Sequence, residues 1–196
     1  MSEAARGAGQ RAVFLDRDGT VIEEAGYLDR LDRLVIFPWS IDAIRLLNRG
    51  GFSVVIVTNQ AGIAKGLFDE TFVQETHRLL DRKVSAAGGR IDGFYYCPHL
   101  PDASVEAYRR ACDCRKPMAG MIQAAARDLG IDVTRSFVVG DRWIDMEMAQ
   151  RAGAAGVLVE TGYGKTEATR PPKGFESTPI VANLIEATTW ILKRDI

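Results

Sequence analysis

Residues 12–20 read AVFLDRDGT, so that four apolar residues lead directly into two aspartates one position apart. An apolar run of this length that ends in turn residues predicts a buried β-strand. The carboxylates of Asp16 and Asp18 then lie at the carboxyl end of that strand, which is where open α/β sheets bind their ligands. This stretch therefore predicts both the class of the fold and the position of a polar site.

Similar apolar runs recur along the chain, at 53–57, 92–97, 136–140 and 156–160. Segments with helical spacing alternate with them, at 40–49, 69–87, 118–129, 144–152 and 183–194. This alternation predicts an α/β fold, with a Rossmann-like parallel sheet and helices on both faces. We expect one domain over 11–196, a flexible tail at 1–10, and a polar, proline-rich loop at 163–179.

The net charge of −1 gives no electrostatic footprint for nucleic acid or for an anionic membrane. No run approaches the roughly 18 consecutive apolar residues of a membrane span. The first residues, MSEAARGAGQR, lack the apolar segment of a signal peptide. We therefore expect a cytoplasmic protein with no nucleic-acid or membrane partner, and a small domain of this charge favours a monomer.

Asp16 and Asp18 repel each other unless a cation lies between them. A hard divalent ion with oxygen ligands, most simply Mg2+, resolves that conflict. A solvated aspartate-rich turn is the alternative interpretation of a single pair of this kind. Polar residues at two further strand ends favour a site: Thr58, Asn59, Gln60, Asp141, Arg142 and Asp145.

All three cysteines of the chain lie between residues 97 and 114. Cys97 and His99 are two positions apart, and Cys112 and Cys114 are two apart after twelve intervening residues. A closed tetrahedral zinc site takes four ligands of this kind, and a site with no open position is structural. A buried strand cysteine beside a loop histidine is the alternative. We expect a structural zinc loop over 97–114.

Arg115, Lys116 and Pro117 follow the last cysteine without a gap. Closing the metal loop would therefore fix the direction of the two cations. Lys116 supplies a point charge that suits a phosphoryl group. Pro117 suits the first turn of the helix that follows.

Four motifs, FLDRDGT, VTNQ, RKP and VGDRWID, resemble in this order the motifs of the haloacid-dehalogenase superfamily of phosphatases. The resemblance spans about residues 12–160 and implies a strand order of 5-4-1-2-3. It also implies Mg2+-dependent hydrolysis of a phosphomonoester through an aspartyl-phosphate. The roles it implies are Asp16 as nucleophile, Asp18 as acid and base, Thr58 and Lys116 as phosphoryl contacts, Asp16, Asp18 and Asp141 as Mg2+ ligands, and Asp145 as a support behind them.

The zinc loop resembles one branch without a large cap domain, formed by D-glycero-D-manno-heptose 1,7-bisphosphate 7-phosphatases and histidinol-phosphate phosphatases. The Gly26-Tyr27 pair, TNQAGIAKG at 58–66 and the twelve-residue span inside the loop resemble the heptose enzymes. This implies a phosphorylated sugar substrate and a step in nucleotide-heptose synthesis for lipopolysaccharide precursors. Its implied contacts are Glu24, Tyr27, Asn59, Gln60, Arg115 and Arg142. Histidinol phosphate or another small phosphomonoester is the alternative substrate.

Two other classes of function are disfavoured. A non-catalytic scaffold is disfavoured because every motif residue is present, and a phosphotransferase or mutase because a small loop excludes little water. His77 is expected on the surface of a helix. Trp39 and Trp143 are expected to pack against the core.

Overall fold

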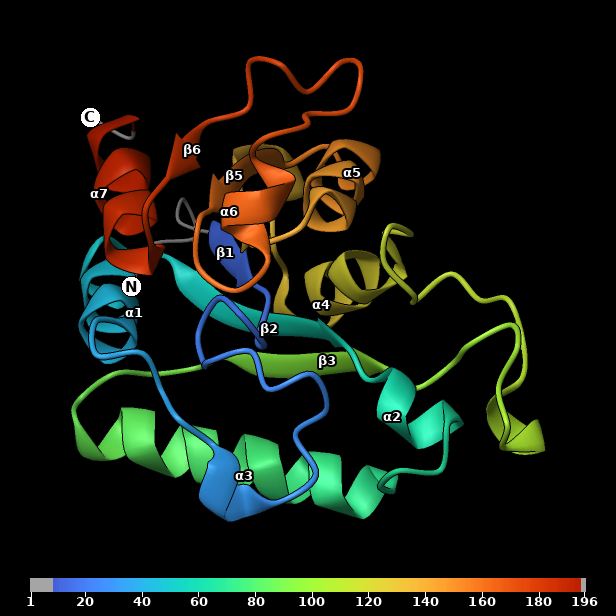
Figure 1. Cartoon of the computed structure of the whole chain (residues 1–196). Helices are drawn as coiled ribbons and strands as arrows, with labels where there is room; N and C mark the ends of the chain where they lie inside the picture. Colours follow the sequence, from blue (N-terminus) through green and yellow to red (C-terminus); the bar gives the residue numbers. More distant parts are fainter. Residues whose placement is uncertain (1–8, 195–196) are drawn as a thin grey trace.

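Six strands of the computed structural model form one parallel sheet in the order β3-β2-β1-β4-β5-β6 (Figure 1). The structure describes residues 9–194. The strands are β1 (Ala12–Leu15), β2 (Ser53–Asn59), β3 (Gly93–Cys97), β4 (Phe137–Gly140), β5 (Ala155–Val159) and β6 (Ile180–Val181). The predicted α/β fold and the implied order of five strands are confirmed, and β6 extends the sheet beyond β5. Strands β1 and β4 are neighbours at the point where the strand order reverses.

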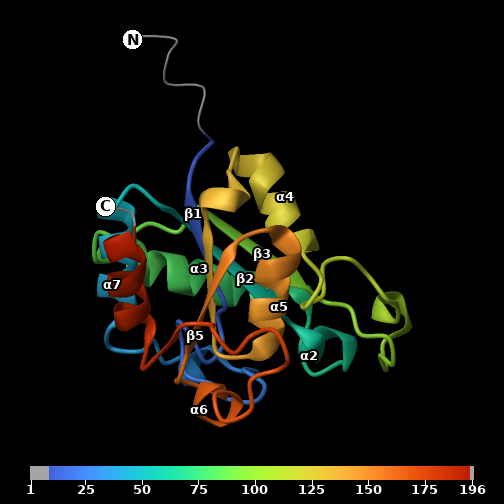
Figure 2. The same cartoon turned by 90° about the horizontal axis from the view of Figure 1, so that it is seen from above.

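Helices cover both faces of this sheet (Figure 2). One face carries α1 (Ser40–Arg49), α3 (Glu70–Ala86) and α7 (Leu184–Arg194), and the other carries α4 (Gly120–Leu129) and α5 (Trp143–Ala152). Two four-residue helices follow β2 and β5, namely α2 (Ala61–Ala64) and α6 (Gly164–Glu167). Short 3-10 helices span Leu31–Arg33, Glu106–Tyr108 and Val133–Arg135.

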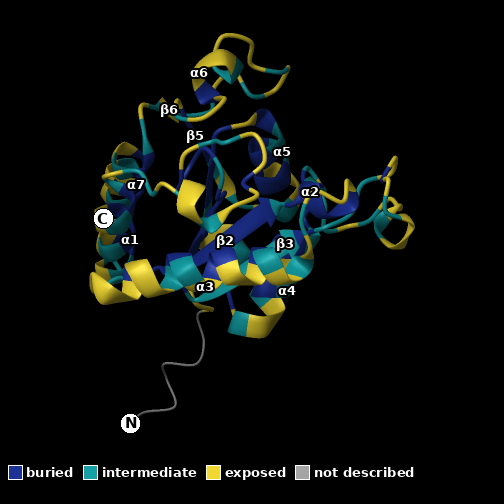
Figure 3. Cartoon of the chain, turned by 60° about the horizontal axis from the view of Figure 1, so that its bottom comes forward, coloured by how far each residue is buried: buried dark blue, intermediate teal, exposed yellow. Residues whose placement is uncertain are grey.

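Strand β1 shows why both faces need cover. Its four residues are fully buried, with Val13 and Leu15 in the core below α1, α3 and α7, and Ala12 and Phe14 in the core below α4 and α5. Figure 3 shows the same burial along the central strands. Burying one large apolar side chain such as Leu15 contributes roughly 1.5–3 kcal/mol. The aspartates that follow β1 are therefore held at the edge of a rigid core.

Helix α3 begins where its sequence predicts. The Asp69 carboxylate accepts a hydrogen bond from the Phe72 N–H (2.8 Å), which satisfies one free donor of the first turn. Val73, Leu80 and Val84 are buried, and Leu80 and Val84 pack in the core below the sheet. Their spacing is that of an amphipathic helix with one apolar stripe.

The prediction that Pro117 lies in the first turn of α4 is wrong, because the helix begins at Gly120. Residues 115–119 form a turn instead, in which the Met118 N–H donates to the Arg115 carbonyl oxygen (2.8 Å). The Gly120 N–H donates to the carbonyl oxygen of Asp113, also at 2.8 Å. A Cβ atom on Gly120 would collide with that carbonyl, so the close approach requires glycine.

Of the tail predicted at 1–10, residues 1–8 lie outside the described part of the chain. Gln10 forms an isolated bridge with Ile131, through main-chain hydrogen bonds to Gly130 and Asp132 (both 2.9 Å). The predicted loop at 163–179 contains α6 at its start. Among residues 9–194, no helix combines the length and the apolar character that a membrane crossing requires.

Candidate active site

The carboxyl ends of β1, β2 and β4 line one cavity of about 280 Å3. Every residue predicted from the sequence to act in catalysis or substrate binding lines it: Asp16, Asp18, Glu24, Tyr27, Thr58, Asn59, Gln60, Arg115, Lys116, Asp141 and Arg142. Arg17, Phe68 and Tyr163 line it as well and were not predicted. The volume is near the lower end of the range for ligand pockets and suits a small molecule.

Three buried aspartates meet in this cavity. Asp16 follows β1, Asp141 follows β4, and Asp145 lies in the first turn of α5. Each offers a carboxylate oxygen, and these atoms lie within 4.8 Å of one another. Burial and neighbouring carboxylates raise the pKa of Asp16 to about 7, although Lys116 opposes the shift. The same two causes raise the pKa of Asp141 to about 8.

Lys116 is a buried cation that hydrogen-bonds to two of the three aspartates. Its Nζ donates to Oδ1 of Asp16 (2.6 Å) and to Oδ1 of Asp145 (2.7 Å). Burial alone would lower the pKa of Lys116, but Asp145 and Asp16 outweigh burial and raise it. Oδ2 of Asp141 accepts the Tyr163 N–H (2.7 Å), whereas its Oδ1 is buried with no hydrogen-bond partner in the described structure. Three carboxylates, one ammonium and an orphaned oxygen fit a hard divalent cation such as Mg2+.

The Asp18 carboxylate is engaged outside this cluster. It accepts hydrogen bonds from Nε and NH2 of Arg17 (3.1 and 3.2 Å) and from Nε2 of Gln60 (3.0 Å). The Thr58 hydroxyl donates to it at 3.4 Å. Asp145, which was expected behind the metal ligands, therefore stands in the acidic cluster, and the side chain of Asp18 does not.

Charged and aromatic side chains pair around the opening of the cavity. The Arg142 guanidinium lies over the Tyr163 ring, and the Lys65 ammonium lies over the Tyr27 ring, both 5.1 Å from the ring centroid. Tyr27 is 39% exposed, so a ligand can reach it. Glu24 accepts a main-chain N–H from the turn that follows it, and burial raises its pKa.

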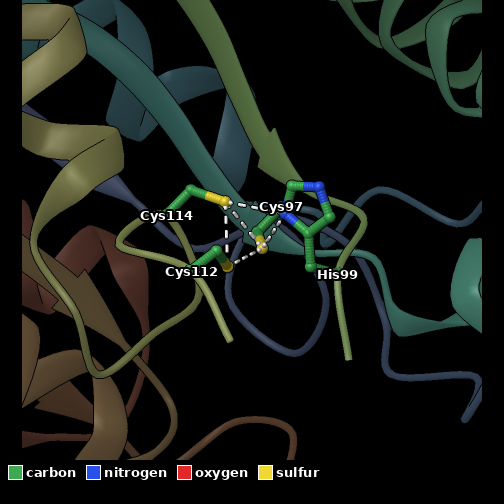
Figure 4. A group of neighbouring side chains, drawn as sticks. All are labelled: Cys97, His99, Cys112 and Cys114. Atoms are coloured by element: carbon green, nitrogen blue, oxygen red, sulfur yellow. Dashed lines mark hydrogen bonds between the residues drawn. The ribbon is translucent and has the colours of Figure 1, made fainter. Parts of the chain in front are cut away.

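The four predicted zinc ligands converge at the end of β3, whose last residue is Cys97 (Figure 4). Their sulfur atoms are separated by 3.5 Å (Cys97–Cys112), 2.9 Å (Cys97–Cys114) and 3.3 Å (Cys112–Cys114). Nδ1 of His99 lies 3.3 Å from the Cys114 sulfur. A tetrahedron with zinc–sulfur bonds of about 2.3 Å has sulfur atoms roughly 3.8 Å apart, so the four side chains fit zinc after small shifts. Hydrogen bonds from the other two thiols lower the pKa of Cys114 to about 5.

Main-chain contacts connect this cluster to the cavity. NH1 of Arg115 donates to the His99 carbonyl oxygen (3.1 Å). The Asn59 side chain accepts the Lys116 N–H (3.0 Å) and donates to the Lys116 carbonyl oxygen (3.4 Å). Asn59 therefore uses its amide on the main chain of Lys116, which fixes the ammonium at the aspartates.

The prediction that His77 lies on the helix surface is wrong. The residue is 6% exposed, and its ring stacks on Phe94 with the centroids 4.7 Å apart. Its Nε2 lies 3.3 Å from NH1 of Arg17. A signal was present in the sequence, because Val73, His77 and Leu80 stand at positions i, i+4 and i+7 of one helix face.

Both tryptophans that were expected to pack do so. Trp39 stacks on Phe37 with centroids 5.3 Å apart. Trp143 is 5% exposed and lies 6.0 Å from the Phe175 ring. Its Nε1 donates to the carbonyl oxygen of Glu167 (2.8 Å), which attaches α6 to α5 beside the cavity.

Residues 113–187 match the HAD-hydrolase-like family model. The chain is 44% identical over 182 residues to the D-glycero-beta-D-manno-heptose-1,7-bisphosphate 7-phosphatase of Escherichia coli (strain K12), covering 92% of this chain and 87% of that one. It is 45% identical over 152 residues to the enzyme of the same name from Photorhabdus laumondii, with 77% and 81% covered.

Solved structures give a similar result. The D,D-heptose 1,7-bisphosphate phosphatase from B. bronchiseptica, complexed with magnesium and phosphate, superimposes with a TM-score of 0.83 at 33% identity, over 94% of this chain and 99% of that one. The corresponding phosphatase from Burkholderia thailandensis gives a TM-score of 0.68 at 30% identity, over 93% and 98%.

Proposed function

This chain belongs to the HAD-like phosphatases, in the family of its heptose-bisphosphatase relatives, and on that premise we propose that it removes the C7 phosphate of D-glycero-D-manno-heptose 1,7-bisphosphate. The β anomer is the substrate that the names of its relatives specify. The observation that carries the proposal is the meeting of Asp16, Lys116 and Asp141 at the ends of β1 and β4.

In the first step, Asp16 attacks phosphorus in line, the bond from phosphorus to the sugar oxygen breaks, and an aspartyl-phosphate forms. Asp18 gives a proton to the departing sugar oxygen. As a carboxylate, Asp18 then takes a proton from the water that attacks phosphorus, which releases phosphate and restores Asp16. Thr58 and Lys116 hold the phosphoryl oxygens, and Asn59 keeps Lys116 in place.

Asp16, Asp18 and Asp141 would hold the Mg2+ ion. Asp16 and Asp141 offer carboxylate oxygens, and Oδ1 of Asp141 is buried without a hydrogen-bond partner, so it could bind the ion directly. Asp18 would contribute its main-chain oxygen, because its carboxylate is engaged by Arg17 and Gln60. When bound, the ion supplies positive charge that offsets the charge of the phosphoryl oxygens.

We assign a structural Zn2+ to Cys97, His99, Cys112 and Cys114. Four protein ligands leave no open position, so this ion would hold the loop and take no part in hydrolysis. The loop takes the place of a large cap domain beside the cavity. Its contribution to the reaction is the fixed direction of Arg115 and Lys116.

The sugar and its second phosphate would contact the rim of the cavity. Arg115 and Arg142 line it and offer planar, permanently charged donors for the phosphate at C1. Glu24 and Tyr27 face the sugar hydroxyls, and Gln60 reaches the reacting phosphate from its place beside Thr58. The planar guanidinium of Arg142 can offer a phosphate two parallel donors, whereas a lysine ammonium would offer a point charge.

The reaction would be a step in nucleotide-heptose synthesis for lipopolysaccharide precursors. We propose a monomer, because the domain is small and its net charge is −1. We place the enzyme in the cytoplasm, since three cysteines that form no disulfide and would bind zinc suit a reducing compartment. Neither nucleic acid nor membrane has a part in this proposal.

The test is phosphate release by zinc-replete protein with Mg2+, measured for both anomers of the heptose bisphosphate and for histidinol phosphate. We expect kcat/KM for the β anomer to exceed the other values by about a hundredfold, or roughly 2.7 kcal/mol of transition-state preference. Asp16→Asn protein, prepared in parallel, reports any contaminating phosphatase. A preference for histidinol phosphate would contradict the assigned substrate and leave the chemistry of Asp16 standing.

A further inference from the structure

Arg17 is a buried cation whose guanidinium reaches into the active site. It is 2% exposed, although it lies between Asp16 and Asp18 in the sequence. Its Nε and NH2 donate to both carboxylate oxygens of Asp18, in the forked geometry that fixes a carboxylate in one plane. The remaining nitrogen, NH1, points to a residue on another element, His77 of α3.

The chemistry of this contact fixes the protonation of the imidazole. A guanidinium has five N–H donors and no acceptor, so Nε2 of His77, 3.3 Å from NH1, has to be the acceptor. The ring is therefore neutral, with its proton on Nδ1. Burial, reinforced by the charge of Arg17, lowers the pKa of His77 to about 3, which agrees with a neutral ring.

The position of the imidazole is itself fixed by packing. The ring stacks on Phe94 of β3 and meets the edge of Tyr96 with centroids 5.9 Å apart. Helix α3 adds Val73 and Leu80 to the buried stripe on either side of it. His77 is therefore a rigid hydrogen-bond acceptor. The long side chain of Arg17 could adopt several rotamers without it, so the contact with His77 restricts Arg17 to one of them.

We propose that His77 is a positioning residue for hydrolysis, which holds Arg17 in the orientation that clamps the Asp18 carboxylate. The inference rests on the proposed role of Asp18 as acid and base. Proton transfer depends on where the carboxylate stands, and a positioned acid or base accelerates a reaction about 10²–10⁴-fold. Arg17 donates to both oxygens of the Asp18 carboxylate, and Gln60 donates to Oδ2 as well, so the two side chains together set that position.

The test compares two replacements of His77. His77→Leu keeps an apolar body but removes the acceptor, so we expect kcat for the proposed substrate to fall about tenfold or more while KM changes less than about twofold. His77→Gln restores an acceptor oxygen, and we expect it to recover most of the lost kcat. The control is Val84→Ala, on the same stripe of α3 and away from the cavity, which loosens the core without changing kcat.

A double-mutant cycle asks whether His77 acts through Arg17. In an Arg17→Met background, adding His77→Leu should leave kcat unchanged, because the group that His77 positions is gone. An equal loss in both backgrounds would overturn the proposal. So would a wild-type kcat in His77→Leu, a Gln variant no better than Leu, or an equal loss in Val84→Ala.

A spectroscopic measurement separates this inference from the proposed function. Nitrogen-15 NMR of the wild-type imidazole should show a protonated Nδ1 and an unprotonated Nε2 for His77 at neutral pH. The opposite tautomer or a charged ring would overturn the contact with Arg17. A wild-type protein without phosphatase activity would end the proposed function, whatever the NMR result.

Discussion

Asp16 faces two conflicting demands. It has to be ionised to attack phosphorus, yet it is buried beside two other carboxylates, which raises its pKa to about 7. The hydrogen bond from the Lys116 ammonium to Oδ1 of Asp16 favours the ionised form, but the same ammonium also donates to Asp145. A divalent cation at the unpartnered oxygen of Asp141 would remove the conflict, because it neutralises the negative charge that the single Lys116 ammonium does not balance.

Replacing the nucleophile tests this assignment. Asp16→Asn should abolish phosphate release, because a carboxamide cannot form the aspartyl-phosphate. The fold should persist, since Lys116 keeps its bond to Asp145. The measurement is kcat together with circular dichroism, and Asp32→Asn, an exposed surface carboxylate, is the matched control. Turnover at the wild-type rate in Asp16→Asn would show that another group attacks phosphorus.

The backbone at Gly162 lies so close to the Asp141 carboxylate that a substitution there can test the role of this contact. Its φ is +55°, and a Cβ atom there would overlap Oδ2 of Asp141 and crowd the Cα of Gly19. We expect Gly162→Ala to raise the Mg2+ concentration for half-maximal activity about tenfold, because groups behind a metal ligand set its orientation.

The control for that substitution is Gly174→Ala. Gly174 also has a positive φ, +93°, but no atom lies within 4 Å of its added Cβ. The Gly174→Ala variant therefore carries only the conformational penalty of a positive φ, roughly 1–2 kcal/mol, and no collision. Equal Mg2+ dependence in the two variants would mean that backbone strain, and not contact with Asp141, explains the effect.

The residues that sequence reasoning found and those that it missed differ in how they enter the site. Asp16, Thr58 and Asp141 directly follow apolar runs, so their place at the sheet edge could be predicted from strand ends. His77 reaches the site only through Arg17, from a helix that is distant in sequence. The apolar stripe of α3 placed it inside, but its partner depends on tertiary packing, which periodicity does not encode.

At the scale of elements, the zinc loop is supported from both sides. The Glu70 carboxylate, in the first turn of α3, accepts hydrogen bonds from the hydroxyls of Tyr96 and Tyr108. These bonds lower the pKa of Glu70, so it stays ionised. Tyr108 belongs to the loop, and its anchoring limits how far residues 100–111 can move. The metal would then fix the end of the loop that carries Lys116.

Removing zinc should therefore lower stability and activity together. After a chelator has stripped the metal and Mg2+ has been restored in excess, we expect a lower Tm and a lower kcat, because three thiols and an imidazole lose the ion that orders them. Zinc content is measured on the same sample. Readdition of zinc should restore both quantities. Unchanged melting and activity after verified removal would contradict a structural role.

The long elements could be predicted from the sequence, and the short ones could not. The interval 40–49 predicted for α1 is the one observed, since its apolar spacing and the two glycines that follow it agree. Helices α2 and α6 have four residues each, too few for a periodic signal. The start of α4 was misplaced because the turn at 115–119 depends on Asp113 and on closure of the loop. Local signals are absent where tertiary contacts decide the conformation.

At the scale of the whole molecule, the sheet brings together charges that the chain separates widely. Asp16 and Asp141 are 125 positions apart, and each is buried where β1 meets β4. The folding of the protein is therefore coupled to their protonation. In both groups the folded pKa, about 7 and about 8, exceeds the ordinary value of 3.8. The folded state then binds more protons than the unfolded chain, so raising the pH through this range lowers the free energy of unfolding.

We therefore expect the Tm of protein without Mg2+, but with zinc retained, to fall by several degrees between about pH 6.5 and about pH 8.5. The pKa of His77 is shifted in the opposite direction, to about 3, so its protonation changes the free energy of unfolding mainly below the ordinary pKa of 6.5. Above that pH, His77 adds little to the change in Tm. Mg2+ stabilises the ionised carboxylates, so the rise in Tm on adding it should be larger at the upper pH. In Asp141→Asn, which lacks one of the two groups, both the fall and the gain from Mg2+ should shrink. A wild-type Tm that stays level or rises with pH would show that the pKa values of Asp16 and Asp141 are not raised in the folded protein.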